Sequence, residues 1–319
     1  MKAVVYDNYG SPDLLRLEDV PKPVPDDYQV LVKIYAASIN SWDWDNLTGK
    51  PFEYRFMTGL FKPKNNLLPG RDIAGKVEVV GKNVTGFKVG DDVFGDLADK
   101  GWGAFAEYIC ADENQLTPKP SFLSFEDAAC LPHGGNLAVQ GLIDVGKIKA
   151  GQKILINGGG GSTGTLAIQI AKLFDVEVTA VDHTDKLNFM LTLGADHVID
   201  YTKEDFTNLA QKYDLIFDVK TNRSFFDYRH VLNPGGIYAT VGGRTSRLLK
   251  VLLFGKLSKK YNVRIVMYKA NKDSNYLLEL FESGKLKLVI DKTFPLENTS
   301  DAFWFFSEGR FKGKIVVTT

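Results

Sequence analysis

The sequence predicts an α/β protein with two domains, a β-rich domain shaped as a partly closed barrel and a domain built on a doubly wound parallel sheet. Its 319 residues are enough for about two domains. Short strand candidates follow one another up to about residue 122. From Ser124 onward, apolar runs typical of strands alternate with segments of helical spacing.

The first region is rich in strands and turns. Its clearest strand candidate is Gln29 to Ala36, whose residues alternate between two faces, and a proline-rich link at 21–25 precedes it. The other strand candidates are residues 3–6, 74–80, 86–95 (between two turns) and 104–111. Many short strands at close spacing are typical of a barrel.

The second region begins with a helix at Ser124–Cys130, with Ser124 as its cap and Asp127 three residues later. Strands are then expected at residues 154–156, 176–181, 197–199, 215–218, 237–241 and 263–267. Helices are expected near 164–174, 185–193, 203–211, 224–232 and 246–257, and the run NPGG at 233–236 is expected to stop one of them.

Two strands close the chain. Leu286–Ile290 is expected on the edge of the parallel sheet and Lys314–Thr318 in the first domain. The expected domains are therefore residues 1–123 with 291–319, and residues 124–290.

A glycine-rich turn dominates the second region. The strand at 154–156 leads into turn residues 157–161, and the next strand ends on Asp182. Glycines let the backbone approach a pyrophosphate, and the N–H groups of the helix's first turn face the anion. Within a strand–helix–strand unit, this run predicts a dinucleotide site rather than a purely structural turn. The residues expected around the pyrophosphate are Gly158, Gly159, Gly161, Ser162, Thr163 and Gly164.

Composition excludes several classes of protein. Lysine plus arginine equals aspartate plus glutamate, 39 of each, which argues against nucleic-acid binding driven by charge. The start of the chain has neither a long apolar core nor an arginine-rich leader, so nothing there marks it for export or import. Only Cys110 and Cys130 are present, so no disulfide framework is expected, and a cytoplasmic location fits.

Motifs along most of the chain carry a family resemblance. They are LPGRDIAGKV at 68–77, VG at 80–81, GDDVFG at 90–95, AACLP at 128–132, the turn 158–164, LGADHVIDY at 193–201 and GKIVV at 313–317. With these motifs the chain resembles the zinc-free branch of the medium-chain dehydrogenase/reductase family, the quinone oxidoreductases and enone or alkenal reductases. The resemblance implies a GroES-like β-barrel catalytic domain, a Rossmann domain, a nicotinamide cofactor in the cleft and a homodimer.

The same comparison argues against zinc. Catalytic zinc needs three ligands of cysteine, histidine or carboxylate type. The positions resembling those ligands hold Asn40, Arg71 and His133, and of these only His133 can bind zinc. Without a Lewis acid, alcohol oxidation loses its usual means of stabilising an alkoxide. We therefore expect hydride transfer to the C=C of an α,β-unsaturated carbonyl or to a quinone.

Two sets of residues favour different cofactors. Asp182 would accept a hydrogen bond from a ribose 2′-OH and repel a 2′-phosphate, which favours NAD. Lys186 and Tyr201 match positions that hold the 2′-phosphate in NADPH-using relatives, and a protonated His183 would assist them. The resemblance favours NADP(H), with NAD(H) still open.

Further site residues follow from the resemblance. Val241, Gly242 and Gly243 end a strand and are expected to face the nicotinamide or the substrate, although a plain turn is the alternative. Asn40 matches a polar residue near the nicotinamide, although a buried turn asparagine fits nearly as well. Tyr54 is the candidate proton donor or hydrogen-bond partner of the substrate carbonyl.

Other interpretations remain open. Two basic and apolar segments, 244–260 and 55–69, either wall the substrate cleft and form a dimer contact or touch an anionic membrane surface. An NAD-dependent alcohol dehydrogenase is the second enzyme hypothesis, and a non-catalytic nucleotide-binding regulator of the same fold is the third.

Overall fold

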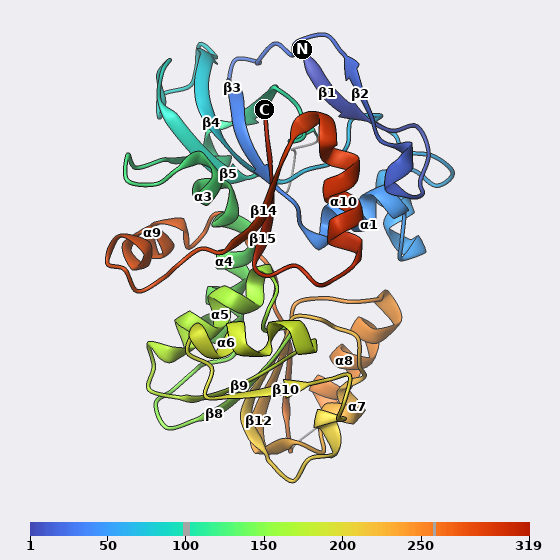
Figure 1. Cartoon of the computed structure of the whole chain (residues 1–319), viewed down its shortest axis with the longest axis vertical. Helices are drawn as coiled ribbons and strands as arrows, with labels where there is room; N and C mark the ends of the chain where they lie inside the picture. Colours follow the sequence, from blue (N-terminus) through green and yellow to red (C-terminus); the bar gives the residue numbers. More distant parts are fainter. Residues whose placement is uncertain (98–102, 258–259) are drawn as a thin grey trace. The chain divides into compact units, whose positions relative to one another are not determined.

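The computed structural model describes residues 1–97, 103–257 and 260–319. The described residues divide into two compact units. The first unit consists of Met1–His133, Ala270–Ser274 and Ile290–Thr319, and the second of Gly134–Lys269 and Asn275–Val289. Both ends of the chain therefore belong to the first unit (Figure 1).

The first unit is built on a seven-stranded sheet, in which the strand order is β14-β15-β3-β4-β5-β7 and β6 pairs with β3. All pairs are antiparallel except β14 with β15. Its strands are β3 (Gln29–Ser38), β4 (Asp72–Val80), β5 (Asp92–Asp96), β6 (Tyr108–Asp112), β7 (Thr117–Pro118), β14 (Ile290–Pro295) and β15 (Lys314–Thr318). A separate ribbon pairs β1 (Lys2–Val5) with β2 (Arg16–Asp19).

Apolar side chains from the strands and from α10 form the core of this unit. Val30, Val32 and Ile34 on β3 are fully buried, and Phe303 of α10 stacks edge-on against Phe105 with 5.4 Å between ring centroids. The helices of the unit are α1 (Ser41–Thr48), α2 (Arg55–Thr58), α3 (Phe125–Cys130) and α10 (Thr299–Ser307). The Ser124 cap of α3 is confirmed, because Ser124 Oγ accepts the Asp127 N–H at 3.0 Å.

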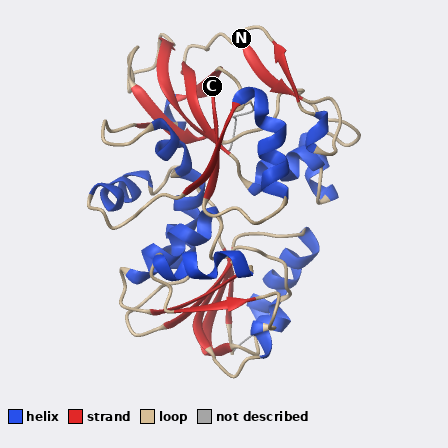
Figure 2. Cartoon of the chain, viewed as in Figure 1, coloured by secondary structure: helices blue, strands red, loops and turns tan. Residues whose placement is uncertain are grey.

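The second unit is built on a six-stranded parallel sheet in the order β10-β9-β8-β11-β12-β13. Its strands are β8 (Lys153–Asn157), β9 (Glu177–Asp182), β10 (His197–Asp200), β11 (Tyr213–Asp218), β12 (Leu232–Thr240) and β13 (Asn262–Ile265). Its helices are α4 (Pro132–Val139, which starts in the first unit), a π-helical segment η4 (Gln140–Val145), α5 (Ser162–Lys172), α6 (Leu187–Thr192), α7 (Phe225–Tyr228), α8 (Thr245–Leu257) and α9 (Ser274–Glu282), most of which appear in Figure 2.

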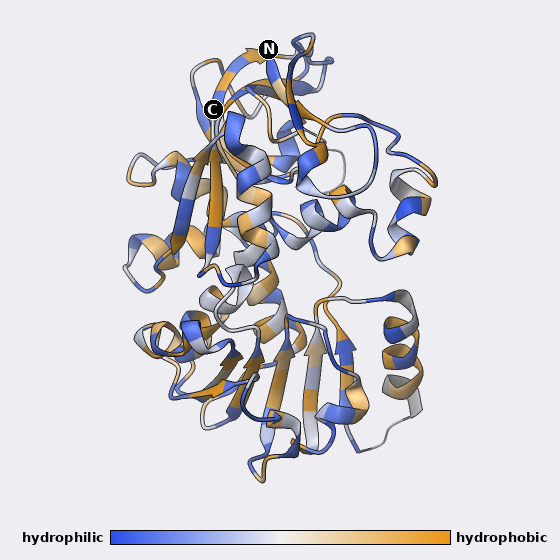
Figure 3. Cartoon of the chain, turned by 45° about the vertical axis from the view of Figure 1, so that its right-hand side comes forward, coloured by the Kyte–Doolittle hydropathy of each residue, from blue (hydrophilic) through white to orange (hydrophobic). Residues whose placement is uncertain are grey.

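From β8 the chain first adds β9 and β10 on one side of the sheet, and then returns to add β11, β12 and β13 on the other side. The point of reversal therefore lies between β8 and β11. Because parallel connections are right-handed, α5 and α6 cover one face of the sheet while α7 and α8 cover the other. Helices on both faces explain why the central strands are apolar along most of their length (Figure 3). The predicted barrel-like first domain and doubly wound second domain are both confirmed, and the reversal point is where such sheets bind ligands.

One helix predicted in the second unit is wrong, and another is shorter than predicted. Residues 203–211 contain only a 3₁₀ turn at Phe206–Asn208, and residues 224–232 contain only the four residues of α7. Asp205 Oδ1 accepts the Thr207 N–H at 3.0 Å, and such local side-chain bonds compete with helix formation. The NPGG run lies inside β12 as a bulge, where the pairing with β11 shifts register, and it does not end a helix.

The strand predicted at 286–290 is also wrong. Residues 286–289 form no strand, and β14 begins at Ile290 and pairs with β15 in the sheet of the first unit. In the same unit, β5 and β6 occupy only the later parts of the segments 86–95 and 104–111. Residues 124–133 lie with the first unit, outside the range expected for it, because α3 packs against β3 and β4.

The two basic and apolar segments carry exposed apolar side chains. Leu249, Leu252 and Leu253 of α8 are each more than half exposed, and so are Phe56 and Phe61 of the earlier segment. Lys259 of the later segment lies outside the described residues. None of the helices that the structure describes is both long and apolar enough to cross a membrane.

Candidate active site

The glycine turn connects β8 to α5 in the second unit. Gly158 has a φ of 91°, a left-handed conformation that favours glycine, and its N–H donates to the Val181 carbonyl at 2.9 Å. Gly161 caps α5, and a Cβ built there would meet no atom closer than 3.9 Å. The backbone at the start of α5 is therefore open to a ligand.

Two other glycines allow close packing beneath this turn. A Cβ on Gly164 would lie 2.0 Å from the Gly158 carbonyl oxygen and 2.6 Å from Gly159 Cα. A Cβ on Gly159 would lie 2.8 Å from Met190 Sδ. The first turn of α5 can therefore rest directly on the glycine turn only because these positions lack side chains.

Ser162 and Thr163 open helix α5. The Ser162 hydroxyl is buried and has no hydrogen-bond partner among the described residues, and Thr163 is also buried. The hydroxyl oxygen lies 2.6 Å from the position of a Cβ built on Gly134, so it packs against α4. The open backbone of the glycine turn at the start of α5 is the feature that fits a dinucleotide pyrophosphate.

Asp182, at the end of β9, is tied to the glycine turn. Its Oδ2 accepts the Gly160 N–H at 2.9 Å, and its Oδ1 accepts the His183 N–H at 2.8 Å. Lys186 Nζ lies 3.4 Å from the same Oδ1, and both side chains are buried. The acid predicted to bind a ribose hydroxyl and the lysine predicted to bind a phosphate therefore pair with each other.

Tyr201 and His183 lie beside that pair, at the carboxyl ends of β10 and β9. The Tyr201 ring is 45% exposed, and its centroid lies 6.2 Å from the His183 ring. Partial burial and the neighbouring Asp182 carboxylate raise the pKa of Tyr201, so its hydroxyl remains a donor at neutral pH. The structure thus brings the four predicted specificity residues to adjacent strand ends.

Val241, Gly242 and Gly243 follow the end of β12. The Val241 N–H donates to the Asp218 carbonyl at 3.3 Å, and the Gly242 carbonyl accepts Arg247 Nη1 at 2.9 Å. Gly243 has a φ of 119°, which other residues rarely adopt. These residues form a constrained turn at the ligand-binding edge of the sheet, whereas the ring or substrate they would face stays a prediction.

A buried polar cluster lies behind this turn, and the sequence did not reveal it. The Asp218 carboxylate is fully buried and accepts hydrogen bonds from Tyr238 OH at 2.6 Å, from Asn157 Nδ2 at 3.0 Å and from the Arg247 guanidinium. Burial, followed by the Asp218 charge, raises the pKa of Tyr238. Asp218 ends a predicted strand, but no spacing signal links it to Arg247 on another element.

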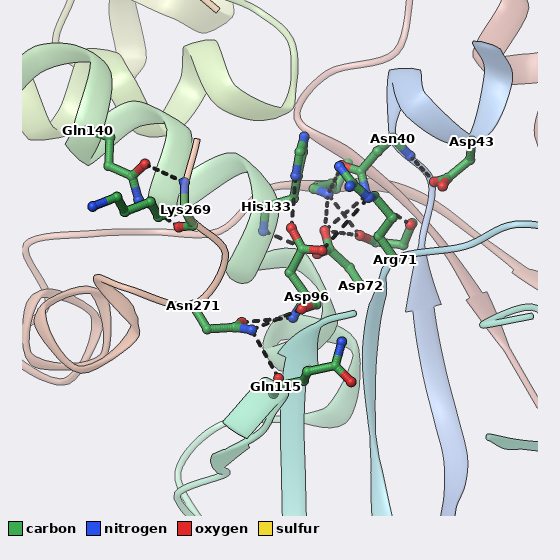
Figure 4. Close-up of polar contacts among 12 residues, drawn as sticks. Asn40, Asp43, Arg71, Asp72, Asp96, Gln115, His133, Gln140, Lys269 and Asn271 are labelled. Carbon is green, nitrogen blue, oxygen red and sulfur yellow. Dashed lines mark hydrogen bonds and ion pairs between the residues drawn. The ribbon is translucent and has the colours of Figure 1, made fainter. Parts of the chain in front are cut away.

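In the first unit, Asn40 is the centre of a second buried cluster (Figure 4). Lys314 Nζ donates to Asn40 Oδ1 at 2.7 Å, to Ser38 Oγ at 2.8 Å and to Asp72 Oδ2 at 2.9 Å. Asn40 Nδ2 donates to Asp72 Oδ2 at 3.0 Å. The amide of Asn40 is therefore fixed by protein groups, and the sequence did not single out Lys314 as its partner.

Arg71 and His133 lie next to this cluster, and their contacts do not suit a metal. His133 Nδ1 lies 3.0 Å from Asp96 Oδ2, and the Arg71 guanidinium lies 4.2 Å from the Trp42 ring centroid. Within the described part of the chain, no group of three histidine, cysteine, aspartate or glutamate side chains could hold a metal ion. The Lys314 ammonium already neutralises Asp72, so the residues present do not fit a zinc site.

Tyr54 lies at the end of the short turn that precedes α2. Its ring centroid is 5.2 Å from that of Trp42, and its side chain is half-buried. Burial and the nearby Asp45 charge raise the pKa of Tyr54. Its hydroxyl has no partner among the described residues and remains available to a substrate oxygen.

Comparisons with known proteins agree with this architecture. Residues 26–121 match the alcohol dehydrogenase GroES-like domain, and residues 193–317 match a family described as zinc-binding dehydrogenase. The chain is 36% identical to the 2-methylene-furan-3-one reductase of Solanum lycopersicum and 34% identical to the chloroplastic NADPH-dependent alkenal/one oxidoreductase of Arabidopsis thaliana, covering 99% of this chain and 79% of each relative. The quinone oxidoreductase from Coxiella burnetii superposes with a TM-score of 0.90 at 29% identity, covering 100% of this chain and 99% of that one.

Proposed function

Because this chain belongs to the medium-chain dehydrogenase/reductase family, in the branch of the quinone oxidoreductases and enone reductases, we propose that it reduces an activated C=C bond or a quinone with NADPH. The observation that carries the proposal is the open glycine turn, where a Cβ built on Gly161 at the start of α5 would meet no atom closer than 3.9 Å. The printed activities of its relatives, an alkenal/one oxidoreductase and a furanone reductase, supply the substrate class.

NADPH is favoured over NADH by the position of Asp182. Its carboxylate is engaged by the Gly160 and His183 N–H groups and by Lys186, so it acts as a support for the glycine turn. A carboxylate so engaged is a weaker acceptor for a ribose hydroxyl. Tyr201, which is 45% exposed, then offers a hydroxyl to a 2′-phosphate, and Lys186 would exchange its ion pair with Asp182 for one with the phosphate.

Zinc independence is supported by the Lys314 cluster. An ammonium group bonded to both Asn40 and Asp72 supplies the positive charge that a metal would otherwise bring to this position. We therefore expect that dialysis against a strong chelator leaves turnover unchanged.

The residues of the chain have distinct roles in this reaction. The glycine turn would hold a reduced nicotinamide cofactor, which would supply a hydride for the β-carbon of the acceptor. Negative charge would then develop on the carbonyl oxygen, and we assign to the Tyr54 hydroxyl the role of donating a hydrogen bond or a proton to it. The Lys314 cluster holds Asn40 in one orientation, which makes Asn40 a positioning residue.

Titration of the purified protein with NADPH and NADH, followed by cofactor fluorescence, tests the proposal. Tighter binding of NADPH, and its oxidation when an enone or a quinone is added, would support the reductase. The Lys186→Met variant should lose more affinity for NADPH than for NADH, because NADH loses only the support that the Lys186–Asp182 pair gives the glycine turn. Preference for NADH together with oxidation of simple alcohols would instead indicate an alcohol dehydrogenase, and tight binding without oxidation by any acceptor would indicate a regulator.

A further inference from the structure

A pocket of about 520 Å³ lies between α7 and α8 in the second unit. Its walls come from the segment 221–226, which follows β11 and includes α7, and from residues 244–254 at the start of α8. Four cationic side chains line it, from Arg223, Arg244, Arg247 and Lys250, and no acidic side chain is among the described residues of its lining. The volume is within the range of pockets that hold small-molecule ligands.

Two of the four cations already have carboxylate partners. Arg223 Nη1 lies 2.8 Å from Asp205 Oδ1. The Arg247 guanidinium pairs with the buried Asp218 and donates Nε to the Arg223 carbonyl at 2.7 Å. These two arginines therefore have structural roles, and they hold the two walls of the pocket together.

The other two cations are uncompensated. Arg244 and Lys250 are exposed, and neither has a side-chain partner among the described residues. Ser246 and Arg247, in the first turn of α8, line the same pocket, so the positive end of a thirteen-residue helix faces it as well. Two free positive charges and a helix N-terminus in one cavity match the charge of a phosphate monoester, about −1.5 to −2 at neutral pH.

The deeper wall of the pocket is aromatic. Phe226 and Phe254 pack edge to face with 4.4 Å between ring centroids, and Phe225 and Val251 are buried beside them. An inorganic ion would leave this surface without a partner. A ligand with both a phosphate head and an apolar body would satisfy both parts of the pocket.

We propose that this pocket binds a phosphate monoester that carries an aromatic or acyl group. Arg244 and Lys250 bind the phosphate, and Phe226 and Phe254 pack against the apolar group. The pocket borders the glycine turn, because Asn157 at the end of β8 donates its Nδ2 to Asn222 of the lining at 3.2 Å. It lies beyond that turn, against the segments that follow β11 and β12, whereas α5 follows β8. The proposal concerns a second ligand and does not depend on the reductase activity.

Fluorescence of 8-anilinonaphthalene-1-sulfonate, an anionic aromatic probe, tests the pocket directly. The whole chain is titrated with the probe in the presence of saturating NADPH, which prevents binding of the probe at the glycine turn. We expect a saturable signal that n-octyl phosphate displaces at least tenfold more strongly than inorganic phosphate, sodium octanoate or n-octanol. Equal displacement by octanoate would overturn the proposal, because the phosphate would then contribute no more than a carboxylate does. Equal displacement by octanol would also overturn it, because the charged head would then contribute nothing.

A pair of matched double variants locates the site. Arg244→Gln/Lys250→Gln should weaken displacement by octyl phosphate at least tenfold, because it removes both uncompensated charges. Lys285→Gln/Lys287→Gln, which removes two exposed lysines elsewhere in the same unit, should bind as the unmodified protein does. Unchanged NADPH affinity shows that each variant is folded, and equal losses in the two double variants would mean that binding reflects net charge alone.

Discussion

At the scale of single residues, contacts decide roles that residue types leave open. The strand end predicts Asp182 at the cofactor site and the family resemblance implies Lys186 there, but their ion pair and the Gly160 hydrogen bond appear only in the fold. The sequence likewise identifies Asn40 but not Lys314, which lies 274 residues further along the chain. Spacing along one element can be read from a sequence, whereas a partner on another element depends on how the elements pack.

Tyr54 supplies the first prediction at this scale. Tyr54→Phe should lower kcat/KM for an enone by about 10²-fold, because it removes a hydrogen bond that strengthens as charge develops on the substrate oxygen. NADPH affinity should not change. Steady-state kinetics measure both quantities, and Tyr28→Phe, which alters an exposed tyrosine in the same unit, is the matched control. Unchanged turnover in Tyr54→Phe would remove this residue from the mechanism.

Asp45 supplies a prediction about pH. Burial raises the pKa of Asp45 from 3.8 to about 7, so the folded protein binds this proton more tightly than the unfolded chain does. The resulting stabilisation is present at low pH and is lost as the pH rises from about 4 to about 7. Relative to Asp45→Asn, the free energy of unfolding should therefore fall over this range, by at most about 4 kcal/mol.

Urea unfolding at several pH values between 4 and 8 measures this difference. Glu282→Gln, which removes an exposed carboxylate, is the control and should show a curve parallel to that of the unmodified protein. If the free energy of unfolding of Asp45→Asn changes with pH in parallel with that of the unmodified protein, then Asp45 does not titrate with a raised pKa.

At the scale of elements, the sequence predicts strands better than it predicts the connections between them. All six strands of the parallel sheet fall near their expected positions, because each is a short apolar run between turn residues. The helix expected at 203–211 is absent because Asp205 bonds the local backbone instead. Leu286–Ile290 misled because the backbone N–H and carbonyl of Lys287 bond the Gln169 side chain instead of a neighbouring strand, a partner that the apolar run does not reveal.

The contact between α5 and the glycine turn gives a prediction for a whole element. Gly164→Ser should reduce the free energy of unfolding by about 1–3 kcal/mol and weaken NADPH binding, because any Cβ there meets the Gly158 carbonyl oxygen. Gly161→Ser is the matched control for stability, because that position is open and serine is a favourable helix cap. Thermal unfolding compares the two variants, and equal stability would show that α5 can move away from the turn; cofactor titration compares Gly164→Ser with the unmodified protein.

At the scale of the whole molecule, the Lys314 cluster connects distant parts of the chain. Lys314 lies on β15 near the end of the sequence, whereas Ser38 and Asp72 lie on β3 and β4. The Lys314 and Asp72 side chains are almost completely buried. A buried charge that loses its partner is costly, so this cluster should contribute strongly to the stability of the first unit.

Lys314→Met should accordingly lower the free energy of unfolding by about 3–5 kcal/mol. Adding Asp72→Asn to the same chain should restore part of the loss, because it removes the unpaired buried charge. Arg310→Met, which alters an exposed cation in the same unit, should have little effect. Denaturant unfolding of the unmodified protein, of Lys314→Met, of Asp72→Asn and of the double variant completes the cycle. Losses of the two single variants that simply add in the double variant would show that the two groups are not coupled.

The position of β15 between β14 and β3 also fixes an order of events during synthesis on the ribosome. Every strand of the parallel sheet has been translated by residue 265, whereas the first unit lacks two neighbouring strands of its sheet until residue 318 has been added. Until then, the edge of β3 that β15 will cover remains open in the nascent chain, and open strand edges invite pairing with other chains. The part of the protein that is made first is therefore among the last to be completed.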